Sequence, residues 1–118
     1  MRKAKLKAGE FVEIPYYCFA PNRRGWDGWL FENAQVIRVL GKNKYGQRVA
    51  LLEVCDHRGT HGEHYEKSVC ETKIFEKSDI VKWAQGVVDD APASEYSHGR
   101  YYTEVYWLAN KGLVHGLR

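Results

Sequence analysis

Three segments in the first half of the chain have the spacing and composition of β-strands, and they constrain the fold more than any other feature. They cover residues 11–14, 30–40 and 47–54. In the first segment Val12 and Ile14 share one face while Glu13 lies on the other, which is the period of two expected of a strand. A long aromatic loop and a short basic loop connect the segments. This order predicts a small, strongly bent β-barrel.

The residues around these segments predict where the strands end. Pro15 is expected to close the first strand, because proline has no N–H to donate to a neighbouring strand. The second strand is apolar on both faces near its end, at Val36 and Ile37, which is typical of a strand covered on two sides. Residues 41–47, with a glycine near each end, predict a hairpin connection. The third strand is nearly continuous in apolar residues from Val49, so we expect it to be central.

The second half of the chain has weaker patterns. Residues 55–68 are polar and contain several glycines, which predicts a long loop or an irregular hairpin tip, and residues 69–75 alternate as a fourth strand would. Residues 77–84 are interpreted as a tight turn leading into a short last strand. The alternative is a short helix capped by Ser78 and ended by Gly86.

The C-terminal part is expected to pack on the same domain as the strands. Residues 87–94 resemble a connector, and residues 103–110 predict a short helix with Gly112 just beyond its end. We therefore divide the chain into strands over 1–86 and an aromatic extension over 87–118. A total of 118 residues suits one domain of this kind.

Composition excludes several classes of protein. The chain is 44% hydrophobic and 28% charged, and no window approaches the roughly 18 apolar residues of a membrane helix. The basic N-terminus is not followed by an apolar segment, so we expect no secretory signal and a cytoplasmic protein. Three cysteines, an odd number, are expected to be reduced thiols.

Charge is distributed unevenly along the chain. Residues 1–54 contain ten Lys and Arg against five Asp and Glu, a net charge of +5, whereas residues 55–118 contain eight against ten, a net charge of −2. The basic half is the half predicted to form most of the strands. This asymmetry permits a polyanionic partner such as nucleic acid without requiring one.

Short motifs in the first half resemble the opening of SH3-like small barrels of the Tudor and Agenet type. The motifs are Gly9-Glu10-Phe11-Val12, Asp27-Gly28 and Ala34-Gln35-Val36, with Phe31 where the family pattern has a tryptophan. The resemblance covers about residues 8–84. It implies an all-β SH3-like barrel of about five strands, to which the residues after 86 add the C-terminal extension with its predicted short helix. Barrels of this type bind peptides, DNA or RNA or are purely structural, so the resemblance implies no single activity.

The aromatic loop is the first candidate site. Aromatic rings can hold a cation or stack on unpaired bases, and neighbouring arginines can hold phosphates. The alternative is that these rings close one end of the barrel. Asp27 could supply the acidic residue of a cation-binding cage. The candidate residues are Tyr16, Tyr17, Phe19, Arg23, Arg24, Trp26 and Trp29.

A group of cysteines and histidines is the second candidate. Zinc binds Cys and His side chains, but the spacing here matches no known zinc signature, and a polar loop that contains histidines is the favoured interpretation. We therefore expect no metal and no cofactor. Cys55 and Cys70 are interpreted as strand-end thiols that face each other across a hairpin. The residues considered are Cys55, His57, His61, His64 and Cys70.

The third candidate is a basic set on the N-terminal tail and the hairpin. If the tail lies near the hairpin, these side chains could release counterions from a nucleic-acid backbone. The alternative is that they only keep the protein soluble. The set contains Arg2, Lys3, Lys5, Lys7, Arg38, Lys42, Lys44 and Arg48.

These features together predict a binding protein and not an enzyme. The chain has no phosphate-binding glycine loop, no Gly-x-Ser-x-Gly motif and no metalloprotease motif. The leading hypothesis is nucleic-acid binding through the basic hairpin and the aromatic loop. The alternative is a protein-interaction adaptor or inhibitor that uses the aromatic loop and the tyrosine-rich tail. The size and simple organisation favour a small bacterial or phage protein.

Overall fold

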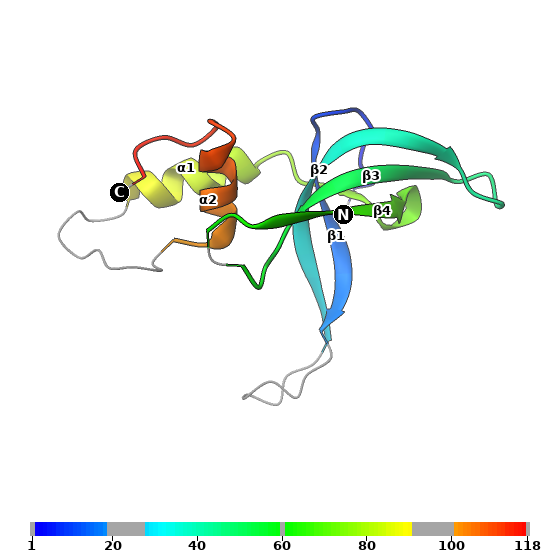
Figure 1. Ribbon diagram of the computed structural model, residues 1–118, viewed down its shortest axis with the longest axis horizontal. Coiled ribbons are helices and arrows are strands. Elements are labelled where there is room, and N and C mark those ends of the chain that lie inside the picture. Colours follow the sequence, from blue (N-terminus) through cyan, green and yellow to red (C-terminus); the bar gives the residue numbers. More distant parts are fainter. Residues whose placement is uncertain (1, 19–27, 60, 91–100, 118) are drawn as a thin grey trace.

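The protein is built from one five-stranded antiparallel sheet and two short α-helices (Figure 1). The computed structural model describes residues 2–18, 28–59, 61–90 and 101–117. The strands are β1 (Phe11–Cys18), β2 (Gly28–Lys42), β3 (Arg48–Cys55), β4 (His64–Cys70) and β5 (Phe75–Glu76). The helices are α1 (Ile80–Asp90) and α2 (Thr103–Asn110), and a single 3-10 turn, η1 (Glu71–Lys73), lies between β4 and β5.

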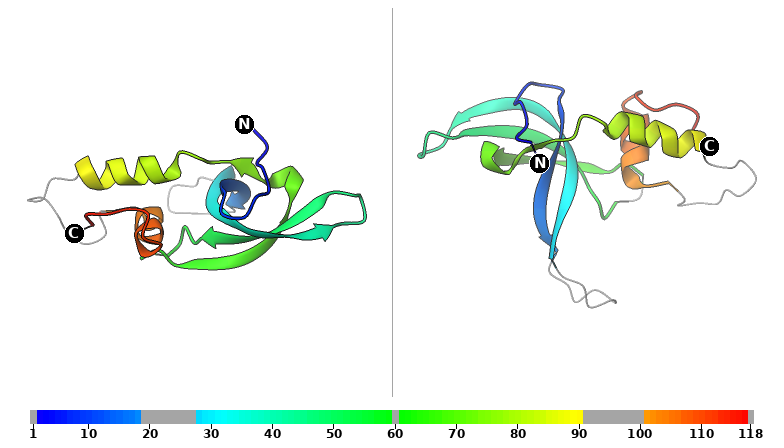
Figure 2. Two further views of the ribbon diagram at one scale, coloured as in Figure 1. Left: turned by 90° about the horizontal axis from the view of Figure 1, so that it is seen from above. Right: turned by 180° about the vertical axis from the view of Figure 1, so that it is seen from behind.

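The strand order β4-β3-β2-β1-β5 makes β2 the central strand. β2 is 15 residues long and pairs with β1 through its first half and with β3 through its second half. Two register shifts in the β2–β3 pair, after Val36 and after Val39, are β-bulges, which bend a strand. The sheet is bent but not closed, because β4 and β5 remain its two edges (Figure 2). The all-β prediction is confirmed at this level.

Two apolar clusters hold the molecule together. The sheet core consists of side chains from the strands and from Ile74, and the helix core joins the two helices to Cys55 of β3 and Phe11 of β1. Members of the sheet core are Val12, Ile14, Ala34, Val36, Ala50, Leu52, Val54, Val69 and Ile74. Members of the helix core are Cys55, Ile80, Ala84, Val88, Tyr101, Val105, Trp107, Leu108 and Val114.

The prediction that Pro15 closes the first strand is wrong. β1 continues to Cys18, and Pro15 lies opposite Phe31 in the β1–β2 pair. The carbonyl of Phe11 accepts a hydrogen bond from the Lys77 amide on the β5 side, so by alternation the backbone of Pro15 also points to that side. β5 pairs only with Val12 and Glu13, so no strand there needs the N–H that proline lacks.

The boundaries predicted around the fourth strand are also wrong. The segment interpreted as a loop over residues 55–68 contains most of β4, which starts at His64. The strand predicted over 69–75 ends at Cys70, and η1 then separates it from β5. β4 is an edge strand with mainly exposed side chains, so its polar sequence carries no apolar alternation for a pattern to detect.

Residues 80–90 form a helix, so the prediction of a turn and a last strand at 77–84 is wrong, and its alternative is right about the helix but not about its end at Gly86. The helix continues through Gly86 to Asp90, which also places the first part of the predicted connector inside α1. Ile80, Ala84 and Val88 recur every four residues and bury one face of the helix. The second predicted helix, over residues 103–110, is confirmed as α2.

Candidate nucleic-acid interface

The β2–β3 hairpin ends in a turn that Asn43 organises. The side-chain Oδ1 of Asn43 accepts hydrogen bonds from the backbone amides of Tyr45 (2.9 Å) and Gln47 (3.0 Å). Asparagine favours such turns because its side chain can replace a backbone acceptor. Gly46 has a φ of +76°, a left-handed conformation that glycine adopts without strain. The turn therefore holds Lys44 and Tyr45 at the tip of the hairpin.

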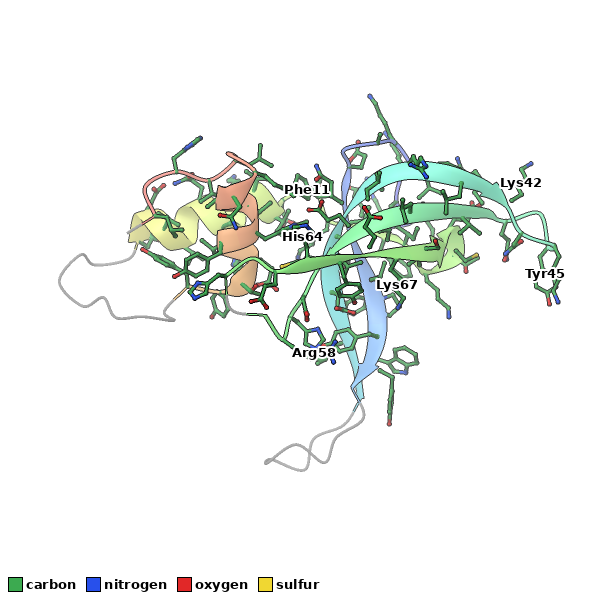
Figure 3. The ribbon with its side chains drawn as sticks, viewed as in Figure 1. Phe11, Lys42, Tyr45, Arg58, His64 and Lys67 are labelled. Carbon is green, nitrogen blue, oxygen red and sulfur yellow. The ribbon has the colours of Figure 1, made fainter. Side chains whose placement is uncertain are left out.

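Tyr45 is the most exposed large hydrophobic side chain among the described residues, at 73%. The Nζ atom of Lys44 lies 5.1 Å from the centre of its ring, within cation–π distance. Figure 3 places Tyr45 and Lys42 together at this end of the molecule. An exposed ring between lysines can stack on a base while the ammonium groups contact phosphates.

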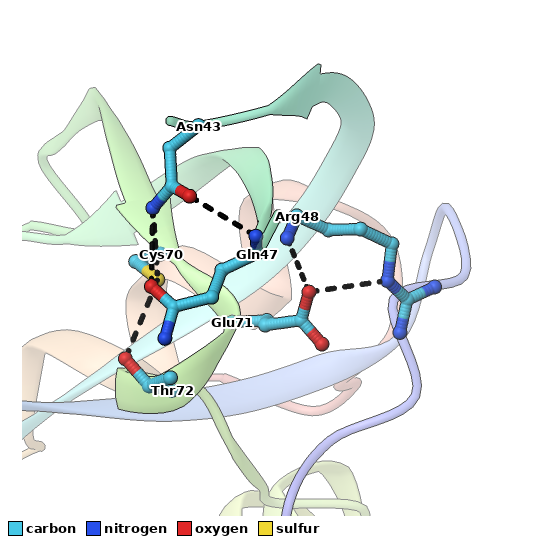
Figure 4. A network of polar contacts seen from close by, with 6 residues as sticks. All are labelled: Asn43, Gln47, Arg48, Cys70, Glu71 and Thr72. Carbon is cyan, nitrogen blue, oxygen red and sulfur yellow. Dashed lines mark hydrogen bonds and ion pairs between the residues drawn. The ribbon is translucent and has the colours of Figure 1, made fainter. Parts of the chain in front are cut away.

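The base of the hairpin is attached to η1 (Figure 4). The backbone amide of Arg48 donates to Glu71 Oε2, and Arg48 Nε lies 3.4 Å from the same oxygen. The hydrogen bond from the Arg48 amide is the main reason why the pKa of Glu71 lies below its usual value. Glu71 therefore stays ionised and holds the hairpin in place.

The N-terminal tail reaches η1 from the other side. The Arg2 carbonyl accepts a hydrogen bond from the Glu76 amide (2.9 Å), and the Ala4 amide donates to the Ile74 carbonyl (3.0 Å), so the tail runs beside β5. Lys3 Nζ donates to the Thr72 carbonyl. The tail and the hairpin thus converge on the same three-residue turn.

This convergence places exposed cations on and beside η1, where the carboxylate of Glu71 is close to Arg48 and Lys42. We call this surface the hairpin patch. Because the five cations outnumber the one acid, the patch has a strong positive charge that can attract a polyanion. Its residues are Lys3, Lys42, Lys44, Tyr45, Arg48 and Lys73.

A second polar network holds the hairpin to the end of β4 (Figure 4). The Cys70 thiol donates to Gln47 Oε1 (3.3 Å) and accepts from the Thr72 hydroxyl (3.3 Å), and Asn43 Nδ2 lies 3.8 Å from the sulfur. The hydrogen bonds from the hydroxyl and the amide of Thr72 hold the pKa of Cys70 below its usual value. The turn residues Asn43 and Gln47 therefore also attach the hairpin to the end of β4.

The described residues of the aromatic candidate site lie apart from the hairpin patch. Trp29 is next to the Gly28 end of β2, whereas the hairpin begins at the Lys42 end, and Figure 1 shows the two ends pointing in different directions. Tyr17 and Trp29 are 48% and 65% exposed and contact each other edge to face, with ring centres 5.5 Å apart. Tyr16 is half-buried and stacks on His57 at 4.4 Å. Phe19, Arg23, Arg24 and Trp26 lie outside the described residues.

The predicted cysteine pair does not face across a hairpin. Cys55 lies opposite His64 at one end of β4, and Cys70 lies opposite Val49 at the other end. The length of the strand separates the two thiols by roughly 20 Å. Burial raises the pKa of the Cys55 thiol to about 12.

The histidines of the second candidate site have separate partners. His61 packs edge to face on Tyr106, and His64 Nδ1 lies 3.4 Å from the Gly62 carbonyl. Within residues 2–18, 28–59, 61–90 and 101–117, no three Cys, His, Asp or Glu side chains are placed to share a metal ion.

His57 belongs to a polar cluster with Tyr65 and the buried Glu32. Glu32 is 4% exposed and is the only charged side chain buried among the described residues. Its Oε2 atom accepts from the Tyr65 hydroxyl (2.9 Å) and lies 3.1 Å from His57 Nδ1. Burial, followed by the hydrogen bond to Glu32, raises the pKa of Tyr65. The cluster ties β2 to β4 and to the segment between β3 and β4.

Sequence reasoning missed two members of the hairpin patch, Tyr45 and Lys73. The Asn-x-x-Gly turn could have pointed to Tyr45, because the second residue after a capping asparagine lies at an exposed tip. No local pattern identifies Lys73, because its place beside the hairpin depends on the pairing of β3 with β4.

Comparisons with protein-family models, curated proteins and solved structures give no match for this chain. Neither helix of the part that the structure describes is long and apolar enough to cross a membrane.

Proposed function

We propose that the protein is a non-enzymatic nucleic-acid-binding module and that the hairpin patch is its binding surface. The observation that carries the proposal is the convergence of the hairpin and the tail on η1, which surrounds Glu71 with cations beside an exposed Tyr45. Each lysine or arginine that contacts a phosphate releases counterions, so a surface of this kind gains affinity at low salt.

The same proposal includes an SH3-like small barrel as the scaffold. The support is the strand order β4-β3-β2-β1-β5, in which a short last strand returns to the first one after a single 3-10 turn. The bulges of β2 bend the sheet toward closure. In this scaffold the hairpin projects from the bent sheet, where a polyanion can reach it.

A salt titration tests the binding proposal. The full chain is mixed with a labelled single-stranded 12-mer of thymidine, and the dissociation constant is measured by fluorescence anisotropy at several salt concentrations. We expect the affinity to fall steeply as the salt concentration rises. In the double variant K42A/K44A, the slope of the logarithm of the binding constant against the logarithm of the salt concentration should be smaller in magnitude by about 1.4, or about 0.7 for each lost phosphate contact on a single strand.

The matched control removes two cations away from the hairpin patch. Arg58 lies between β3 and β4, away from the hairpin (Figure 3), and Lys82 lies on α1. The double variant R58A/K82A changes the net charge equally but should leave the slope unchanged. Absence of binding at low salt, or an affinity that does not respond to salt, would refute nucleic-acid binding.

A protein-interaction role is the second candidate, and the exposed pair of Tyr17 and Trp29 favours it. Large aromatic side chains are enriched among the residues that contribute most to protein interfaces. An adaptor or inhibitor would use this end of the sheet and not the hairpin patch. Affinity capture from cells that contain the protein, repeated with W29A, tests this candidate: a specific partner should be lost with W29A and retained with K42A/K44A.

A further inference from the structure

The sheet leaves a seam between β1 and β4. Among the described strands, β5 pairs only with Val12 and Glu13 of β1, and β4 pairs only with β3. The rest of β1 and the outer edge of β4 therefore have no strand between them. A cavity of about 200 Å³ lies in this seam, and it is lined by Ile14, Pro15, Lys67, Val69, Cys70 and Lys73.

Part of the cavity wall is apolar, Ser68 and Cys70 add polar atoms to it, and two lysines are among the lining residues. Ile14 and Val69 belong to the sheet core, and the ring of Pro15 adds an apolar surface beside them. Lys67 lies between Tyr65 and Val69 along β4, so by alternation it shares their inward face, yet it is exposed because the seam is open. The side chain of Lys73 is also exposed.

The size of the cavity limits what it can accept. Sites for drug-sized ligands commonly enclose about 300–1,000 Å³, so this cavity suits a single planar ring system. The apolar part of the wall favours the faces of such a ring, and two ammonium groups at the rim favour a negative group attached to it. A nucleotide has this combination, with a base and a phosphate.

The seam cavity is continuous with the hairpin patch. Cys70 lines the cavity and also bonds to Gln47 of the hairpin, and Lys73 belongs to both surfaces. We propose that the cavity accepts one unpaired base of a bound single strand while Lys67 and Lys73 hold the adjoining phosphate. This inference rests on the proposed nucleic-acid binding and extends it, because a base in a duplex could not enter the cavity.

Lys67 also has a purely structural interpretation. A charge on the inward face of an edge strand prevents that strand from pairing with another sheet. Either sign of charge would serve that purpose, whereas a phosphate requires a positive one. Charge reversal at this position therefore separates the two roles.

The first experiment compares K67E with K82E, which make the same change in net charge on β4 and on α1. Binding of the full chain to the 12-mer of thymidine and to a 12-base-pair duplex is measured by anisotropy. We expect K67E to weaken single-strand binding about tenfold more than K82E, since hydrogen bonds to charged groups are strong. We also expect the single strand to bind more tightly than the duplex.

The second experiment follows alkylation of the thiols of the folded full chain by iodoacetamide, using mass spectrometry of the peptides obtained by later digestion. Cys70 is partly exposed and its pKa is lowered, so it should react, whereas Cys55 is buried and serves as the unreactive reference. We expect the single strand, but not the duplex, to slow alkylation of Cys70 at least threefold.

Three results would overturn the inference. If the 12-mer binds with the salt slope expected of the hairpin patch, but K67E equals K82E and Cys70 is not protected, the cavity is not a base site and the proposed function stands. If no strand binds at low salt, both fail. If tetraglutamate protects Cys70 as well as the 12-mer does, the cavity accepts an acidic peptide and not a base.

Discussion

Glu32 is the residue whose burial most needs compensation. A buried carboxylate is costly unless hydrogen bonds stabilise it, and here Tyr65 and His57 supply the partners. Tyr65 contributes a donor from an edge strand, so the pair also fixes where β4 lies against β2. This explains why an otherwise polar strand has a tyrosine at a half-buried position.

We expect Tyr65→Phe to lower the free energy of unfolding by about 1–3 kcal/mol, because Glu32 would lose a donor and remain buried. Urea denaturation at pH 7, followed by circular dichroism, measures the change. Tyr45→Phe is the matched control, since it removes a hydroxyl from the exposed hairpin tip and should change stability by less than about 0.5 kcal/mol. Equal effects of the two variants would show that the Tyr65 hydroxyl does not stabilise Glu32.

Cys55 should make the protein sensitive to alkali. Burial raises its pKa to about 12 from 9.0. Below pH 9 the thiol is protonated in both states, so its contribution to stability is fully present. Above pH 9 the unfolded chain loses this proton and the folded chain keeps it, so the free energy of unfolding falls by up to about 1.4 kcal/mol per pH unit, until pH reaches about 12.

Urea denaturation at pH 8, 9 and 10 tests this expectation against Cys55→Ala. The variant should be less stable at pH 8, because a buried side chain has been shortened. Its stability should, however, decline less between pH 9 and 10 than that of the original chain. Parallel declines would mean that Cys55 does not retain its proton.

At the scale of elements, the segment between β3 and β4 is fitted closely to α2. The Asn110 side chain donates to the His61 carbonyl (3.2 Å), and the Gly62 amide donates to the Thr103 hydroxyl (3.3 Å). A Cβ atom on Gly62 would lie 2.5 Å from the backbone nitrogen of Trp107. Only glycine therefore allows the segment to approach the helix so closely.

Gly62→Ala and Gly46→Ala form a matched pair that separates this close approach from backbone strain. Both glycines have a left-handed backbone, with φ of +79° and +76°, but a Cβ atom on Gly46 would meet nothing within 4 Å. Each change should lower the free energy of unfolding by about 1–2 kcal/mol, because alanine is strained in a left-handed backbone conformation. Gly62→Ala should cost about 1–3 kcal/mol more, because α2 must move. Thermal unfolding of both variants measures the difference, and equal losses would mean that α2 is not in close contact.

At the scale of the whole molecule, Phe11 and Glu53 connect the two cores. Phe11 starts β1 and packs edge to face on Trp107 of α2, with ring centres 5.7 Å apart. Glu53 of β3 accepts hydrogen bonds from Trp107 Nε1 (2.7 Å) and Lys111 Nζ (2.6 Å). The sheet and the helices are therefore expected to unfold together.

Phe11→Ala should weaken this coupling. In the original chain, the urea transition followed by tryptophan fluorescence should coincide with the one followed by far-ultraviolet circular dichroism. In the variant we expect the free energy of unfolding to fall by at most about 3–5 kcal/mol, because Phe11 is only half-buried. We also expect that the two transitions no longer coincide. Coincident transitions in the variant would show that other contacts suffice to couple the cores.

Local patterns in the sequence predicted the elements that local forces determine. Alternation identified β1, apolar runs identified β2 and β3, and the spacing of Val105 and Leu108 identified α2, since these patterns are properties of a single strand or helix. The sequence also predicted three members of the hairpin patch, because they flank a turn that neighbouring residues determine. These members are Lys42, Lys44 and Arg48. The start of β4 was not predicted, because an exposed edge strand has no apolar pattern.

Only the tertiary structure decided which surfaces come together. It brought Lys3 and Lys73 to the hairpin through η1, and it placed Tyr17 and Trp29 at the other end of β2. It also left the seam between β1 and β4 open, with Lys67 at its rim. The physical reason is that these arrangements depend on strand pairing between residues far apart in the chain, whose register is set by the burial of a common core and not by any one segment.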